Sequence, residues 1–338
     1  MNKIIITIFA LSLTGIFLAF FAFQSVQPEK VLSVSSNSSQ QHTQKEAIIP
    51  EIVVDEDNNF KDQWPVKILF GGDMMFDRYI RRIAQQKGYE YSMADLKELF
   101  DASDCVIANL EGPVTENESV SMGSEIGSPD NFKFTFDPAI VNILKDYNMC
   151  LTNIGNNHIG NFGLEGIAVT KKFLEDGGMH YIGDTGLSDE KRYFVEEING
   201  VKLGFVNYNE FTTGSLEHVL EDIKNIKQES DFVIAYTHWG TEYNTLSSER
   251  DQGIAHKLVD AGVDLIIGSH PHVVQESEVY KGKTIYYSLG NLVFDQYFSE
   301  ETKRGSLVQA TFDVSRDTIT FEEHEVKLTP SGNTLLTR

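Results

Sequence analysis

The stretch VDLIIGSHPHVVQ, residues 263–275, combines the pattern of a buried strand with two closely spaced histidines. An apolar run of strand length ends at Gly268, and Pro271 then fixes a short turn between His270 and His272. Two imidazoles on one such turn can face a single point, which is typical of a metal site. Taken alone, the pair is better explained as two ordinary surface histidines after a strand.

Four other apolar runs end in a residue that can bind a metal or act as an acid. They are KILFGGD ending at Asp73, CVIANLE ending at Glu111, CLTNIGNNH ending at Asn157 and His158, and FVIAYTHWG containing His238. In an open α/β sheet the carboxyl ends of the strands lie along one edge and form the binding crevice. Five independent runs therefore predict that oxygen and imidazole ligands converge on one metal site.

Each candidate ligand also has a purely structural alternative. Asp73 could cap the following helix, Glu111 could brace its loop, and His238 could pack beside its neighbour Trp239. The pair Asn157 and His158 could form a turn. The convergence of five runs favours the metal site over these alternatives. Four other histidines fall on expected helices or away from the strand ends, and we expect them to be structural or at the surface: His180, His218, His256 and His324.

The charge of the chain limits the classes of ligand. Among 338 residues, 50 are Asp or Glu and 28 are Lys or Arg, which gives a formal net charge of −22. Such an excess repels nucleic acid and anionic membrane surfaces, so we expect no nucleic-acid partner. A polyanionic ligand would need bridging divalent cations or a local basic rim. The candidates for that rim are Arg81, Arg82, Lys171, Lys172, Lys303 and Arg304.

The amino terminus has the pattern of a membrane anchor. Residues 4–23, IIITIFALSLTGIFLAFFAF, are uncharged and long enough to cross a bilayer as a helix. Because Lys3 precedes them, the rest of the chain is expected outside the cytoplasm. The alternative is a cleaved signal peptide, but FFAFQS at residues 20–25 is a poor cleavage site. We therefore predict an uncleaved single-pass anchor within residues 1–26.

Residues 27–65 are rich in Ser, Gln and Asn and predict a flexible stalk, with an edge strand where IIPEIVV spans 48–54. One folded domain is expected over 66–338, with its core at 66–296 and a C-terminal β-hairpin at 306–326. Strands and helices alternate through this domain, which predicts an α/β fold with helices covering the sheet faces. Strands are expected at 66–73, 105–111, 180–183, 201–209 and 284–291, and helices at 75–88, 93–100, 164–176, 216–227 and 248–261.

The segment 112–136 is irregular apart from a short strand expected at FKFTF, residues 132–136. Because it follows Glu111 directly, it is a candidate substrate loop. Cys105 and Cys150 each lie at an expected buried strand, so we interpret them as two core thiols. A disulfide between them is the alternative, since an exported domain and neighbouring strands would permit it.

The order of the candidate ligands resembles that of the calcineurin-like metallophosphoesterases. Six blocks resemble the CapA family more closely: GGDMMFD, NLEGPVT, NIGNNHIGNFG, THWGTEY, GSHPHVVQ and YSLGNLVFDQ. The resemblance covers residues 66–296, and this family is linked to poly-γ-glutamate capsule synthesis and export in bacteria. It implies a metallophosphatase-like fold of layered sheets flanked by helices.

The resemblance also implies roles for individual residues. It places His238, His270 and Asn157 at one metal position, His272 and Asp73 at a second, and Glu111 between the two. It makes His158 the acid that protonates a leaving group, and it puts Asn109 and Asn291 beside the substrate. Two positions depart from the phosphoesterase pattern, because Met75 stands where a histidine is usual and Glu111 where an aspartate is usual. A thioether is a poor ligand for a hard cation, so either one or two divalent ions, Mn, Zn, Fe or Mg, are expected.

These observations lead to one principal hypothesis and two alternatives. The principal hypothesis is a membrane-anchored protein that acts outside the cytoplasm on poly-γ-glutamate or another envelope polymer, together with capsule-synthesis partners embedded in the membrane. Any chemistry would be metal-assisted hydrolysis, with His158 and Asp73 in the catalytic site. The first alternative is an active phosphoesterase on another envelope substrate. The second is a module that binds a polymer without turnover.

Overall fold

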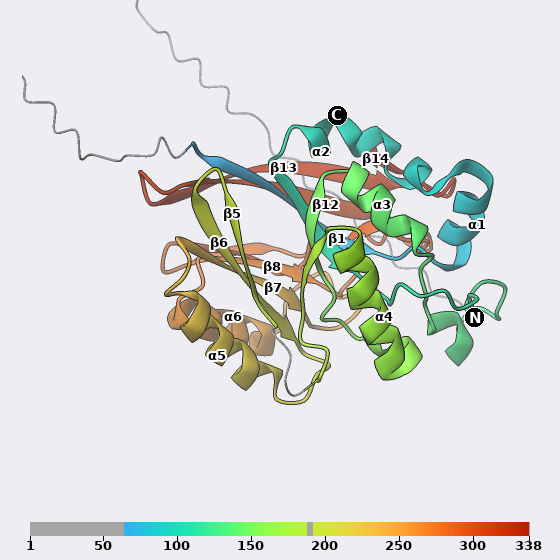
Figure 1. The fold of residues 1–338 in the computed structure, drawn as a ribbon, viewed down its shortest axis with the longest axis horizontal. Helices are drawn as coiled ribbons and strands as arrows, with labels where there is room; N and C mark the ends of the chain where they lie inside the picture. Colours follow the sequence, from blue (N-terminus) through green and yellow to red (C-terminus); the bar gives the residue numbers. More distant parts are fainter. Residues whose placement is uncertain (1–63, 188–191, 338) are drawn as a thin grey trace, which may run out of the picture. The chain divides into compact units, whose positions relative to one another are not determined.

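The computed structural model describes residues 64–187 and 192–337. Within them, two β-sheets stack face to face and helices cover both outer faces (Figure 1). This four-layer arrangement confirms the expected α/β class with layered sheets. The expected anchor, the edge strand at 48–54 and all but the last residues of the stalk lie outside the described residues. No helix within the described part of the chain is long and apolar enough to span a membrane.

The first sheet has eight strands, with β1 near its centre. Its order is β14-β13-β12-β1-β2-β3-β4, and β11 also pairs with β1. Strands β1 to β4 are parallel to one another, whereas β12, β13 and β14 run antiparallel to their neighbours. The bounds are β1 Val66–Met74, β2 Cys105–Leu110, β3 Met149–Asn153, β4 His180–Ile182, β11 Asn291–Val293, β12 Arg304–Asp313, β13 Thr318–Leu328 and β14 Thr334–Leu336.

The second sheet has six strands in the order β5-β6-β7-β8-β10-β9. Its four inner strands are parallel, and the edge strands β5 and β9 pair antiparallel with β6 and β10. The antiparallel partner expected for residues 201–209 is therefore β5. The bounds are β5 Phe194–Ile198, β6 Val201–Asn209, β7 Phe232–His238, β8 Leu265–Ser269, β9 Ser277–Tyr280 and β10 Lys283–Tyr286.

Six α-helices cover the outer faces of the two sheets. Helices α1 to α4 pack on the first sheet, and α5 and α6 pack on the second (Figure 1). The bounds are α1 Arg78–Lys87, α2 Lys97–Asp101, α3 Ala139–Asp146, α4 Gly163–Asp176, α5 Ser215–Ile226 and α6 Glu249–Ala261, with 3₁₀ turns η1 Tyr89–Ser92, η2 Ala94–Leu96, η3 Pro129–Phe132 and η4 Ile159–Phe162. The helix expected from residue 75 starts only at Arg78, because the Asp77 side chain accepts from the Arg78 N–H and caps the helix.

Three further expectations about local structure are wrong. The helix expected at 93–100 divides into η2 and α2, and no side chain caps either segment. FKFTF forms no strand, since only Phe136 makes an isolated bridge, to Val114. The single strand expected at 284–291 ends at Tyr286, and the chain then crosses to the first sheet, where β11 begins at Asn291.

The main core lies between the two sheets and follows the alternation of each strand. In β1, Ile68 and Phe70 face the second sheet, whereas Leu69 belongs to the cluster under α1 to α4. In β7, Ile234 faces the first sheet and Val233 packs toward α5 and α6. Because successive side chains point to opposite faces, strands buried on both sides read as continuous apolar runs. This is why the runs that end in candidate ligands are apolar throughout.

Two glycines let other backbone segments approach the strands just before the ligands. A Cβ at Gly72 would lie 1.9 Å from the carbonyl oxygen of Gly290, and a Cβ at Gly268 would lie 1.9 Å from that of Tyr287. Both distances are far below contact, so no other residue fits without moving the backbone. These close approaches bring the segment 287–291 against both sheets beside the strand ends.

Cys105 and Cys150 form a disulfide between β2 and β3, with their Cα atoms 5.6 Å apart. The interpretation as two separate core thiols is therefore wrong, and the alternative holds. The two strands are parallel neighbours, which brings the cysteine side chains within bonding reach. Sequence spacing alone could not establish this, because it does not specify which strands are adjacent.

The disulfide is expected to stabilise the fold, since its two cysteines are 45 positions apart and the bond restricts the unfolded chain. We predict that the double variant Cys105→Ser/Cys150→Ser lowers the free energy of unfolding in urea by about 2–4 kcal/mol. Thiol titration of the denatured, unreduced protein should find no free thiol. Two titratable thiols, with equal stability of variant and parent, would contradict the assignment.

Candidate metal centre

The five ligand-bearing runs come together, but at the junction of two sheets rather than along one sheet edge. Asp73 and Glu111 lie at the ends of β1 and β2 in the first sheet, and His238 ends β7 in the second. Strand register aligns Asp73 with Asn109 across β1 and β2. The HxH turn follows β8 and reaches across, since the His270 N–H donates to Asp73 Oδ2 at 3.0 Å. The carboxyl ends of both sheets thus build one centre.

Asp73 is fully buried and carries several contacts at once. Its Oδ1 accepts from Asn109 Nδ2 at 2.8 Å, and its Oδ2 lies 3.3 Å from His272 Nδ1. Burial by itself raises the pKa of Asp73, but the hydrogen bonds and charges of His272, His238 and Asn109 outweigh burial and hold the pKa below its usual value. Asp73 is therefore an anion in the folded protein.

Glu111 is equally buried but has far fewer partners. Its Oε2 is 3.5 Å from Asn109 Nδ2, and its Oε1 has no hydrogen-bond partner among the described residues. Burial and the nearby charge of Asp73 raise the pKa of Glu111 well above the usual value. In the absence of a compensating cation, this carboxyl would hold a proton.

The ring of His272 points an electron pair at Glu111. Its Nδ1 is 3.0 Å from Asn291 Oδ1 and 3.3 Å from Asp73 Oδ2, so Nδ1 carries the ring hydrogen in the neutral form. Its Nε2 then presents a lone pair 3.4 Å from Glu111 Oε1. His158 Nε2 lies 3.9 Å from the same oxygen. Three electron-pair donors therefore crowd around one point in a buried site.

This arrangement fits a divalent cation. A proton on Glu111 can satisfy one of the crowded contacts, whereas a cation can satisfy several at once. The ligand atoms of Asp73, Glu111 and His272 lie within 4.8 Å of one another, a spacing at which one ion can contact all three. Two carboxylates with one imidazole suit Mn, Fe or Zn, and Mg accepts the oxygens.

His270 and Glu242 extend the centre in a second direction. The ligand atoms of Glu242, His270 and His272 also lie within 4.8 Å of one another, and buried His270 Nδ1 has no hydrogen-bond partner in the described part of the chain. His270 and His272 have φ values of 98° and 58°, which non-glycine residues rarely adopt and which are enriched at functional sites. Glu242 was missed from the sequence, although it lies in the THWGTEY block, because it follows a strand end by four residues.

His238 and Asn157 also lie at the centre, as expected. His238 is fully buried, its Nε2 is 3.0 Å from Asn157 Oδ1, and its ring centroid is 4.8 Å from that of His270. A neutral ring with hydrogen on Nε2 donates to Asn157 and accepts from Asn109 Nδ2, 3.3 Å from Nδ1. This pair is therefore satisfied without an ion, and it indicates a metal less strongly than the pair His272 and Glu111.

His158 lies at the edge of the centre, with Nε2 3.9 Å from Glu111 Oε1. Its Nδ1 lies 3.2 Å from Asn161 Oδ1, an oxygen that also accepts from the Phe134 N–H at 2.7 Å. Because an amide oxygen only accepts, Nδ1 carries the hydrogen and Nε2 faces Glu111. Burial lowers the pKa of His158 to about 4, so the ring is neutral at pH 7.

Asn109 and Asn291 are fully buried, and the expectation that they contact substrate stays a prediction. Asn109 accepts from Asn153 and Asn156 and donates to Asp73, which fixes the direction of its amide. Asn291 donates to the backbone oxygens of His272 and Thr302 and holds the His272 ring through Oδ1. Both amides orient candidate ligands, Asn109 that of Asp73 and Asn291 that of His272.

Met75 does not take the place of a metal ligand. Its side chain is fully buried in the core beneath α1 to α4, and its sulfur accepts from the Asp77 N–H at 3.0 Å. Beside Asp73, the candidate ligands are therefore Glu111 and His272, and position 75 contributes none.

The comparisons with known proteins agree with the family resemblance of the six sequence blocks. The profile of the family described as bacterial capsule synthesis protein, PGA_cap, matches residues 67–296. The chain belongs to this family. All the residues of the candidate centre, from Asp73 to Asn291, lie within the matched region.

Two relatives from the genus Bacillus are similar to this member of the capsule synthesis family. "PGA biosynthesis protein CapA" of Bacillus subtilis is 32% identical over 256 residues, which covers 71% of this chain and 66% of that protein. "Capsule biosynthesis protein CapA" of Bacillus anthracis is 30% identical over 257 residues, covering 70% and 62%. The chain thus spans slightly less than two thirds of each relative. A solved structure of a novel phosphatase from Mycoplasma pneumoniae is 18% identical with a TM-score of 0.48, covering 78% of this chain and 94% of that one.

Removing His272 tests the centre most broadly, because its ring belongs to both ligand groups. We predict that His272→Ala lowers the affinity for Mn²⁺ or Zn²⁺ by more than about 100-fold, and that Asn291→Ala lowers it by about 10–100-fold through loss of ring orientation. His180→Ala, at a half-exposed histidine outside the centre, is the matched control. Titration calorimetry with the metal provides the readout, and unchanged affinity in His272→Ala would contradict the assignment.

Glu242 is tested by an isosteric change that removes only its charge. Glu242→Gln is expected to weaken binding of one ion about tenfold or more while leaving the group of Asp73, Glu111 and His272 intact. Glu249→Gln, at an exposed glutamate on α6, removes the same charge elsewhere. Equal metal stoichiometry and affinity in Glu242→Gln, Glu249→Gln and the parent protein would exclude Glu242 as a ligand.

Proposed function

We propose that this protein acts on poly-γ-glutamate during capsule synthesis or export and that its buried centre is a metal-dependent hydrolase site. The observation that carries the proposal is the crowding of His272 Nε2 and His158 Nε2 around the unpartnered Oε1 of Glu111. Membership of the capsule synthesis family supports the polymer as the substrate class. The relatives named for capsule or PGA biosynthesis support the same biological setting.

In this proposal Asp73, Glu111 and His272 hold one divalent cation, and Glu242 with His270 contributes to a second. A cation there supplies Lewis acidity, which polarises the oxygen of the bond to be cleaved and acidifies water. Asn109 keeps the Asp73 carboxylate in place through its amide.

His158 handles the proton. As a neutral ring it accepts at Nε2 the proton that the attacking water loses and then passes it to the leaving group, while Asn161 keeps Nδ1 protonated. Phe134 lies against this ring, with centroids 4.3 Å apart, and Phe294 lies 4.7 Å from the ring of His272. These aromatic walls restrict water around the reacting groups.

The proposal also includes the location of the domain outside the cytoplasm, anchored through residues 4–23. The apolar sequence of that segment supports an anchor. The disulfide between Cys105 and Cys150 supports an oxidising compartment, because cytoplasmic thiols are kept reduced. Capsule-synthesis proteins in the membrane would be the partners.

A polymer-binding module without turnover is the second candidate, and Met75 is the observation that favours it. Burial of Met75 leaves the Asp73 side without the extra ligand that phosphoesterases of this pattern carry. Such a site would retain a cation to hold carboxylates and would lack the second one needed for two-metal chemistry. An active phosphoesterase on another envelope substrate is the remaining alternative.

Proton transfer by His158 separates these candidates. We expect the parent protein with Mn²⁺ to shorten poly-γ-glutamate, or to cleave a generic phosphodiester if the phosphoesterase alternative holds. His158→Ala should lower the rate by about 10²–10⁴-fold at saturating Mn²⁺, because it removes proton transfer. His180→Ala should keep the parent rate. A metal-loaded parent that binds the polymer but turns over neither substrate would contradict hydrolysis and leave the binding module.

A further inference from the structure

A cleft of about 580 Å³ opens between the first turn of α1, the loop at 121–132 and the segment 295–298. The loop belongs to the irregular segment 112–136, the candidate substrate loop that follows Glu111. Tyr243 lines the cleft, and its ring centroid lies 6.2 Å from that of His272 in the metal centre. Gln296, on its wall, accepts from Asn291 Nδ2 at 3.2 Å. The cleft therefore adjoins the metal centre and extends away from it.

Two arginines supply positive charge to this cleft. Arg78 has a side chain only 13% exposed, and its buried Nε has no hydrogen-bond partner among the described residues. Its guanidinium lies 5.0 Å from the Phe134 ring, which in turn contacts His158. Arg82 follows four residues later on the same face of α1 and is exposed. Asp295, which pairs with Arg78, is the one acidic residue of the lining.

Arg78 also has a strained backbone. Its φ of 48° is rare for a residue other than glycine, and the contacts of its N–H with Asp77 and of its guanidinium with Asp295 hold it there. Strain of this kind persists where the surroundings enforce it and is frequent at ligand sites.

The prediction of a basic rim is wrong for most of the six residues proposed for it. The one of the six that lines a cleft beside the metal centre lies in this cleft. Arg81 is buried, pairs with Asp77 and donates to the Thr135 carbonyl. Acidic neighbours pair with three others: Lys172 with Asp176, Lys303 with Glu300 and Arg304 with Glu325. Of the six candidates, only Arg82 lines the cleft.

The cleft also gathers exposed apolar side chains. Four of the twelve large hydrophobic residues that the described chain exposes line it: Ile126 at 92%, Phe298 at 66%, Phe132 at 46% and Tyr243 at 41%. Aromatic and aliphatic side chains exposed together around a groove mark a binding surface rather than scattered surface residues. The cleft therefore offers cationic contacts beside an apolar wall.

We propose, building on the proposed function, that this cleft binds an extended chain with regularly spaced carboxylates and feeds it to the metal centre. A γ-linked glutamate chain has carboxylates that Arg78 and Arg82 can pair with, and methylene groups that the aromatic side chains can cover. A free phosphate compound shares the oxyanion chemistry but lacks the methylene groups. The occupant of the cleft is therefore the carboxylate polymer.

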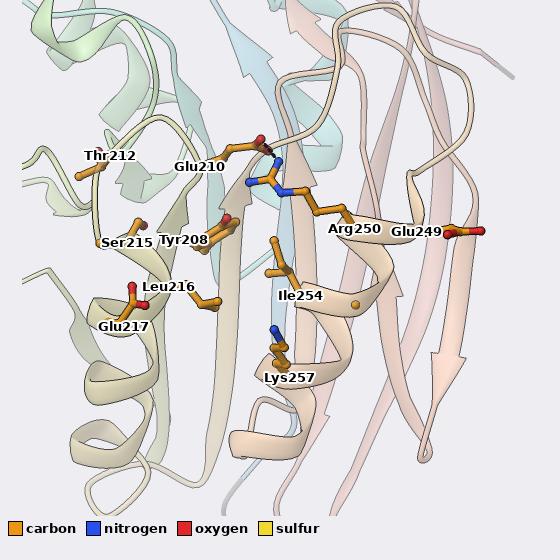
Figure 2. Close-up of a pocket in the computed structure, with 12 residues that line it drawn as sticks. Tyr208, Glu210, Thr212, Ser215, Leu216, Glu217, Glu249, Arg250, Ile254 and Lys257 are labelled. Atoms are coloured by element: carbon orange, nitrogen blue, oxygen red, sulfur yellow. Dashed lines mark hydrogen bonds and ion pairs between the residues drawn. The ribbon is translucent and has the colours of Figure 1, made fainter.

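A second cavity, of about 510 Å³ between α5 and α6, does not suit such a ligand (Figure 2). Three acidic residues line it, Glu210, Glu217 and Glu249, together with two basic ones, Lys257 and Arg250, and Arg250 is already paired with Glu210. The surplus of acidic groups repels carboxylates, so the positive cleft beside the metal centre is the favoured site.

The test measures binding of a fluorescent, short γ-linked oligoglutamate by anisotropy, using the intact protein with Mn²⁺. Arg82→Gln is expected to weaken this binding about tenfold or more, since it removes a charge-assisted contact. Arg316→Gln removes the same charge from an exposed arginine that does not line the cleft, and should change binding less than about twofold. Phe298→Ala should weaken binding several-fold through the lost apolar contact.

Inorganic tripolyphosphate is the second probe, and it distinguishes a phosphate ligand from a carboxylate chain. Weaker competition by tripolyphosphate than by unlabelled oligoglutamate supports the carboxylate chain. Tripolyphosphate binding that depends on Arg82, with no oligoglutamate binding, would overturn the assigned substrate class. Equal effects of Arg82→Gln and Arg316→Gln would overturn the cleft itself. Metal affinity and turnover are measured on the same preparations. A cleft variant that does not change oligoglutamate binding while turnover is intact would reject the cleft alone, whereas a metal-loaded parent without turnover would reject the proposed hydrolase.

Discussion

The centre depends on one electrostatic constraint, the placement of the electron pairs of His272 Nε2 and His158 Nε2 around a buried carboxylate oxygen of Glu111. A buried charged or polar group without a partner is costly, and here several such groups point at one another. Asp73 adds a negative charge close by, which raises the pKa of Glu111 further. A divalent cation removes all of these costs together, which is why the same geometry that destabilises an empty site favours a metal.

The two-sheet architecture produces this crowding. The parallel strands of the two sheets have their carboxyl ends on the same side of the stack. The residues after β1 and β2 therefore meet those after β7 and β8 at the junction of the sheets. Glycine at positions 72 and 268 allows the segment 287–291 to lie against both sheets, and Asn291 then holds the His272 ring. The fold thus brings ligands from distant parts of the chain together and fixes their orientation with buried amides.

Much of this could be predicted from the sequence, because apolar runs that end in Asp, Glu, Asn or His combine burial with chemistry. That pattern identified Asp73, Glu111, Asn157, His238 and the HxH turn, which the structure brings to one place. It could not reveal Glu242 or Arg78, since neither lies at a strand end and only tertiary contacts bring them to the site. Likewise, the pairing of Cys105 with Cys150 and the burial of Arg81 depend on which elements are neighbours. Local patterns specify what a residue can do, and packing decides what it contacts.

The most direct test of the central claim is anomalous diffraction from crystals of the protein grown with Mn²⁺. We expect an anomalous peak within bonding distance of Glu111 Oε1, His272 Nε2 and Asp73, with bond lengths of about 2.0–2.3 Å. A metal-loaded crystal with no peak there, and with Glu111 Oε1 bound instead to a protonated group or to water, would contradict it.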